Sequence, residues 1–237
     1  MDDSIKIVQD IADTILDRPK GFSVGHRHFY LWPVTLGKMF LTQRIVEQLE
    51  INARNLQINP FAEALRLVET HKDDCCLLLA YHTLKTKKEV NNTTTVKARS
   101  NILAKELGND DIATLLILCL TWDKTATFMH HTKIDKELER MKEVNRCKKN
   151  KNTYQFGGVS VYGSIIDQAC ERYGWTFDYV VWEISYTNLQ MMLRDSVKSI
   201  YLTDEEAKRC HVPIDGKSID GNDAQQMDDI IREGNWS

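Results

Sequence analysis

The segment from Tyr173 to Tyr201 specifies its own structure more sharply than any other part of this chain. Gly174 can adopt the left-handed backbone that ends a helix, and Thr176 can cap the next helical turn. The spacing of Thr187–Gln190 predicts a capping box. Beyond it, six apolar residues fall on one helical face: Leu189, Met192, Leu193, Val197, Ile200 and Tyr201. The pattern predicts a helix that packs or is recognised along this stripe, and nothing in it is typical of catalysis.

Proline and glycine are scarce, with 4 Pro and 11 Gly among 237 residues. Because both residues interrupt helices, their scarcity favours long helices over strands and turns. Apolar residues make up 42% of the chain and charged residues 27%, which is ordinary for a globular protein with a sizeable core. We therefore expect a mainly α, multi-helix globular protein with a C-terminal helical module.

One segment near the N-terminus departs from the helical period. Residues 22–32 alternate in short runs on either side of Gly25-His26, which predicts a small β-hairpin. Pro33 ends this element, and Thr35 can cap a helix that runs to about Glu50.

The remaining periodicity predicts further helices and three parts of the chain. Helices are expected over 3–17, 60–71, 73–86, 95–107, 110–121 and 122–147, with a linker at 148–158. The predicted domains are 1–149, a hairpin plus helical domain; 159–211, a C-terminal helical module; and 212–237, an acidic, extended or flexible arm.

Charge is distributed unevenly along the chain, although the net charge is only −3. Residues 133–151 carry a net charge of +4 and residues 215–237 a net charge of −4. The basic stretch is the best candidate for a nucleic-acid contact, through Lys133, Lys136, Arg140, Lys148 and Lys149. Acidic residues interleave with these, however, which is more typical of a solvated helix face with paired charges. We therefore expect no nucleic-acid partner.

The sequence carries no complete motif for catalysis, metal binding or cofactor binding. The segment Gly158–Ser164 has the spacing of a phosphate loop, but Ser164 stands where that loop needs lysine. His26 and His28 would share one strand face, yet no second ligand pair accompanies them. We expect no catalytic residues, no metal and no cofactor, and a protein that is not an enzyme.

The six cysteines and the hydropathy pattern bear on the compartment. No two cysteines form a C-x-x-C pair, which favours reduced, buried thiols in a cytosol. Met1-Asp2-Asp3 is not typical of a signal peptide, and the apolar run Ile112–Leu120 is too short to cross a bilayer. We therefore expect no membrane contact.

Aromatic residues are the best candidates for contact with a partner. Two groups are expected to contribute, one in the hairpin and one in the C-terminal module: Phe29, Trp32, Trp175, Phe177, Tyr179 and Trp182. A core position is the alternative interpretation, and the better one for Trp175.

Two segments of the chain form a pattern. One is the hairpin segment Phe22-Ser23-Val24-Gly25-His26-Arg27-His28-Phe29-Tyr30-Leu31-Trp32-Pro33-Val34-Thr35-Leu36-Gly37-Lys38, and the other is Tyr173-Gly174-Trp175 with its following helices. Together they resemble the tail assembly chaperones of long-tailed bacteriophages. Members of that family often begin with a short β element, continue as helices and end in a module where Gly-Trp precedes an amphipathic helix. The resemblance covers about a quarter of the chain, and residues 50–150 do not contribute to it.

The resemblance implies a non-enzymatic protein of the host cell cytoplasm. Such a protein would bind the tape-measure protein, keep its hydrophobic helices soluble and recruit tail-tube subunits. The alternative is a structural virion component, in the tail, the connector or packaged in the particle, held by protein–protein contacts. Self-association into a homo-oligomer is left open.

Overall fold

Thirteen helices and one two-stranded sheet make up the described part of the chain, residues 3–148 and 158–211 of a computed structural model. Side chains are described from residue 7 onward. The expected fold class is confirmed, because the chain is mainly helical with a small antiparallel hairpin near its N-terminus. The elements are α1 (Asp3–Ile15), β1 (Lys20–Val24), β2 (Arg27–Leu31), α2 (Leu36–Gln48), α3 (Ala53–Ile58), α4 (Pro60–Thr83), α5 (Lys87–Val90), α6 (Thr93–Glu106), α7 (Asn109–Leu120), α8 (Thr125–His131), α9 (Ile134–Cys147), α10 (Val161–Tyr173), α11 (Phe177–Trp182), α12 (Tyr186–Arg194) and α13 (Asp204–Arg209).

The chain divides into two compact units. The larger unit combines residues 1–136 with 156–196, and the smaller unit combines 137–155 with 197–237. Helix α9 therefore begins in the larger unit and continues in the smaller one. The domain boundaries expected from the sequence remain predictions.

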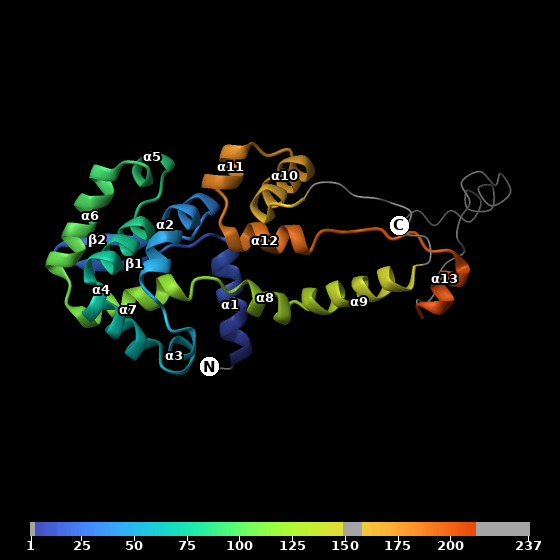
Figure 1. Cartoon of the computed structure of the whole chain (residues 1–237), viewed down its shortest axis with the longest axis horizontal. Coiled ribbons are helices and arrows are strands. Elements are labelled where there is room, and N and C mark those ends of the chain that lie inside the picture. The colour runs from blue at the N-terminus through green and yellow to red at the C-terminus, as the bar shows by residue number, and fades with distance from the viewer. Residues whose placement is uncertain (1–2, 149–157, 212–237) are drawn as a thin grey trace. The chain divides into compact units, whose positions relative to one another are not determined.

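The main core of the larger unit forms around α4, which packs against α6, α7 and β2 (Figure 1). Its fully buried side chains include Leu67, Leu79, Leu103 and Leu116. Two helices were expected, over 60–71 and 73–86, and α4 consists of two helical stretches that meet at His71, where the backbone angles are non-helical. The expected break at 71–73 is thus a kink within α4.

The expected hairpin is confirmed. Phe22 pairs with Phe29 across the two strands, and Gly25 in the connecting turn has φ 58°, a left-handed conformation that glycine adopts without strain. The backbone N–H of Trp32 donates to the carbonyl of His82 at 2.9 Å, which attaches the end of the hairpin to α4.

A second apolar cluster joins α2 to the C-terminal helices of the same unit. Its buried members are Leu36, Ala169, Val180, Ile184, Leu189 and Leu193. The N–H of Tyr186 donates to the carbonyl of Val34 at 2.7 Å, beside an isolated β-bridge between Thr35 and Ser185. Residues 33–37 therefore provide the surface on which α11 and α12 pack.

Several helices begin or end at the residues that the sequence predicts, but α12 does not begin or end where it was expected to. Gly174 has φ 66° and ends α10, while the Thr176 and Thr35 hydroxyls cap α11 and α2. The expected cap at Thr187 is wrong, because the β-bridge of Ser185 fixes the chain earlier and Ser185 caps α12.

The apolar stripe also ends sooner than predicted. Helix α12 stops at Arg194, and the Ser196 hydroxyl donates to the Leu193 carbonyl at 2.8 Å just past that end. Val197 and Tyr201 consequently lie outside the helix and are 83% and 81% exposed.

The single charged helix expected over 122–147 is also corrected. The structure has α8 and α9, separated at Lys133, which has φ 64°. Helix α8 begins at Thr125 rather than at Trp122, and the Thr125 N–H donates to the Asp123 carboxylate at 3.0 Å in the preceding turn. A left-handed residue cannot continue a right-handed helix, which explains the break.

In the smaller unit, the described elements are the later part of α9 and α13. The Cys210 thiol donates to the Val144 carbonyl at 3.8 Å. A capping box of Thr203 and Glu206 is present at the start of α13. The linker residues 149–157 and the acidic arm 212–237 lie outside the described residues.

Candidate functional site

An aromatic cluster projects from the junction of α10 and α11. The Trp175 ring lies 4.6 Å from the Tyr173 ring and 5.1 Å from the Tyr179 ring, measured between centroids. Trp175 is half-buried against the second apolar cluster, whereas Phe177 is 60% and Tyr179 42% exposed. The cluster therefore has a core side and a solvent side.

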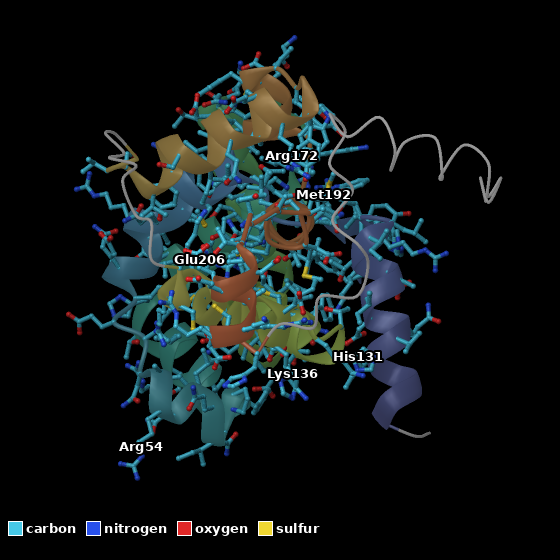
Figure 2. The ribbon with its side chains drawn as sticks, turned by 90° about the vertical axis from the view of Figure 1, so that its right-hand side faces the viewer. Arg54, His131, Lys136, Arg172, Met192 and Glu206 are labelled. Atoms are coloured by element: carbon cyan, nitrogen blue, oxygen red, sulfur yellow. The ribbon has the colours of Figure 1, made fainter. Side chains whose placement is uncertain are left out.

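Polar contacts hold this cluster in place. The Tyr173 hydroxyl donates to the Met192 carbonyl at 2.9 Å and so connects α10 to α12. Arg172 and Met192, which Figure 2 labels, mark these two helices. The Lys87 ammonium binds the Asp178 carboxylate at 2.8 Å, which connects α5 to α11. Exposed aromatic rings on a braced helix suit protein recognition, because little side-chain freedom is lost on binding.

The other three candidate residues lie elsewhere. Phe29 is a core residue, with its ring under the Arg99 guanidinium at 4.6 Å, and is not available to a partner in this structure. Trp32 is half-buried with the Lys85 ammonium 4.6 Å from its ring, and Trp182 packs on Gly37. The structure thus brings the Trp175 and Tyr179 rings together, with Phe177 exposed two residues earlier on α11, and it places Trp32 and Trp182 at a cavity described below.

Sequence reasoning did not identify the apolar face of α1 as a candidate surface. Val8 and Ile15, seven residues apart and so on one helical face, are both more than half exposed. Leu16, just past the end of α1, is similarly exposed. The spacing was visible in the sequence, but spacing alone does not distinguish an apolar face that packs inside from one that remains exposed.

A cavity of about 400 Å³ lies in the larger unit beside the second apolar cluster. Lys38 in its wall is only 2% exposed, and burial lowers the pKa of its amine to about 8. Ten residues line the cavity: Leu16, Asp17, Trp32, Pro33, Thr35, Lys38, Lys85, Trp182, Glu183 and Ser185. Burial also raises the pKa of Asp17, against an opposing hydrogen bond from Ser185.

Lys38 was not singled out from the sequence, although its position carried a signal. Thr42 and Ile45, four and seven residues later, are buried on the same face of α2. A lysine in register with that face is expected to point inward rather than into solvent.

Two further polar groups are buried near Lys38. Complete burial, together with the Lys38 charge, lowers the pKa of His82 to about 3, so its imidazole is neutral at physiological pH. Burial raises the pKa of the Cys119 thiol well above its usual range. Both residues line a second cavity of about 240 Å³, which shares Trp32, Pro33 and Ser185 with the first. A nucleophilic cysteine needs a lowered pKa, so this Cys–His pair does not have the electrostatics of a catalytic one.

Glu63 is a buried carboxylate with a structural role. It accepts hydrogen bonds from the Arg66 guanidinium at 2.6 Å and from the Asn52 N–H at 2.8 Å. These bonds, with Arg66 contributing most, lower the pKa of Glu63 to about 2. The contacts connect α4 to the segment that precedes α3.

Charges on α9 are arranged in pairs. Lys142 binds Glu139 at 2.7 Å, and Arg140 lies 3.8 Å from Glu137, both at i,i+3 spacing. This arrangement fits the interpretation of the basic stretch as a solvated helix face.

Within residues 3–148 and 158–211, no three His, Cys, Asp or Glu side chains converge to hold a metal ion. In the same residues no single helix is long and apolar enough to cross a membrane, although α7 and α8 meet the length and composition test as a pair bent by 54°. Comparison of the chain with protein-family models, curated proteins and solved structures found no match.

Proposed function

We propose that this chain is a non-enzymatic binding protein that acts during the assembly of a larger protein particle. The observation that carries the proposal is the pair of exposed aromatic side chains, Phe177 and Tyr179, on the braced helix α11. Aromatic side chains are enriched among the residues that contribute most to protein–protein binding, and these two are exposed on one short helix. The exposed face of α1, with Val8 and Ile15, supplies a second apolar surface of the same kind.

The resemblance of residues 22–38 and of the Tyr173–Trp175 region to tail assembly chaperones gives the proposal its specific form. In that form the chain binds the hydrophobic helices of a phage tape-measure protein and keeps them soluble until tail-tube subunits cover them. An amphipathic helix buries its apolar face against exposed aromatic and aliphatic side chains, which is the chemistry that α11 and α1 present.

A structural virion component is the alternative function. Two apolar surfaces on separate helices also suit a protein that contacts two permanent neighbours in a particle. The two functions differ in outcome, because a chaperone leaves the particle and a virion component remains. Mass spectrometry of purified particles therefore separates them: peptides of this chain at stoichiometric abundance favour the virion component.

Co-expression tests the proposed chaperone function. We expect the tape-measure protein encoded by the same genome to be soluble when this chain is co-expressed with it and insoluble alone. The double variant Phe177→Ser/Tyr179→Ser should lose most of this effect, because it removes the exposed rings and leaves the buried Val180 and Val181 in place.

The matched control is Tyr201→Ser, which removes an aromatic side chain that is even more exposed, at 81%, but lies outside α11. It should solubilise the tape-measure protein as well as the unaltered chain does. Equal loss in the control and the double variant would contradict the assignment of the surface to α11, provided that both variants keep the melting temperature of the unaltered chain.

A further inference from the structure

The amine of Lys38 is a buried cation with no direct contact partner, although the Glu89 carboxylate on α5 attracts it from farther away. Lys38 is 2% exposed, and its amine makes no hydrogen bond or ion pair with any described residue. Burying an ammonium group is costly unless an opposite charge or hydrogen-bond acceptors compensate for the lost water. An anion or a strong hydrogen-bond acceptor in contact with this amine would therefore lower the cost of burying it.

The cavity beside Lys38 is large enough for a small organic molecule. Its volume of about 400 Å³ falls within the range of small-molecule sites. Trp32 and Trp182 supply aromatic surface in its wall, and Lys85 adds a second cation. Aromatic walls with one or two charged groups are the usual composition of sites for flat, partly apolar ligands.

We propose that this cavity binds a small aromatic monocarboxylate, with the carboxylate on the Lys38 amine and the ring against Trp32 and Trp182. The proposal does not depend on the proposed function, because the cavity does not include Phe177 or Tyr179. A carboxylate would supply the charge-assisted hydrogen bonds that the amine lacks.

The charges around the cavity favour one negative charge over two or none. Asp17 and Glu183 also line the wall and offset the charge of Lys85, so the second negative charge of a phosphate group would have no free cation to pair with. A neutral amide would leave the ammonium of Lys38 without its counter-charge. The expected order of affinity is therefore benzoate above both phenyl phosphate and benzamide.

Binding should depend on the protonation of Lys38. The groups that face its amine from neighbouring elements are His82 on α4, Glu89 on α5 and Cys119 on α7. The pKa of His82 lies near 3, that of Glu89 is lowered by hydrogen bonds from Thr86, and that of Cys119 is raised by burial. Lys38, with a pKa of about 8, is thus the group of this set that changes charge at mildly alkaline pH.

The first experiment titrates the full chain with benzoate, phenyl phosphate and benzamide, followed by calorimetry and tryptophan fluorescence. We expect benzoate to bind with a Kd of about 1 mM or lower, and the other two at least tenfold more weakly. Lys38→Met should weaken benzoate binding by tenfold or more. The matched control Lys88→Met, at an exposed lysine on α5, should bind as the unaltered chain does.

A pH series on the unaltered chain keeps the proposal testable even if Lys38→Met fails to fold. Benzoate stays ionised throughout, so its affinity should fall about tenfold for each pH unit above about 8, as Lys38 loses its proton. Absence of benzoate binding, an affinity that does not change across that range, or equal binding by a folded Lys38→Met variant would each overturn the proposal.

Discussion

Gly37 shows how strongly a single residue can be constrained by its neighbour. A Cβ atom at this position would lie 2.3 Å from Cζ3 of Trp182, closer than nonbonded atoms approach. The Trp182 ring therefore packs directly on the backbone of α2, and this contact brings α11 to α2.

We predict that Gly37→Ala lowers the free energy of unfolding by about 1–3 kcal/mol, because the Trp182 ring must move to admit the methyl group. Gly108→Ala is the matched control: its φ of −71° suits alanine, and the new Cβ would make only an ordinary contact at 3.6 Å from Asp111. The control should change the free energy by less than about 1 kcal/mol in urea denaturation. Equal effects of the two variants would contradict the close packing of Trp182 on Gly37.

The buried amine of Lys38 predicts an unusual dependence of stability on pH. Its pKa is lowered from 10.5 to about 8 in the folded chain, so between these values the unfolded chain binds a proton that the folded chain has lost. The stability contribution of Lys38 therefore rises with pH across that window, by up to about 3 kcal/mol.

Lys38→Met isolates this contribution from the thiols that titrate in the same range. The difference in unfolding free energy between the unaltered chain and Lys38→Met should shift in favour of the unaltered chain as pH rises from about 8 to 10.5. Urea denaturation at both ends of the window measures it. A difference that is the same at both ends would show that the amine is not buried as described.

At the scale of elements, the end of α12 divides the apolar stripe of residues 189–201, which the sequence predicts as one continuous helical face. A core position lies within the helix, and an exposed position lies past its end. Leu189 is fully buried in the second apolar cluster, whereas Val197 lies past the end of the helix and is exposed.

We predict that Leu189→Asp lowers the free energy of unfolding by about 4 kcal/mol or more, because it removes apolar volume and buries a charge. Val197→Asp introduces the same charge at an exposed site and should change it by no more than about 0.5 kcal/mol. Thermal unfolding of both variants checks this, and an equal loss would mean that the stripe continues as one buried face through Val197.

Local signals in the sequence predicted local elements well. Gly174, Thr176 and Thr35 act within one helical turn of their own backbone, so their roles are readable from the sequence. The hairpin was predictable for the same reason, because the alternation of residues on either side of Gly25 is a local pattern.

Features that depend on distant contacts were not predictable in this way. Ser185 rather than Thr187 begins α12, because Ser185 forms a bridge to Thr35, 150 residues earlier by numbering. The separation of Phe29 in the core from Phe177 at the surface likewise depends on tertiary packing. The cavity of Lys38 is assembled from segments between Leu16 and Ser185 that no local pattern connects.

At the scale of the whole molecule, the proposed function depends on apolar surface that the described residues do not cover. Phe177 and Tyr179 on α11, and Val8 and Ile15 on α1, are exposed although their helices are braced by other contacts. We propose that a partner protein covers this surface.

Hydrogen–deuterium exchange tests this central claim most directly. The chain is compared alone and in complex with its proposed partner, a tape-measure protein obtained by co-expression. We predict that the backbone amides of Phe177–Trp182 exchange more slowly in the complex than in the free chain. The amides of α6, which packs against α4 in the main core, should exchange at the same rate in both. A stable complex in which α11 exchanges as it does in the free chain would contradict the account.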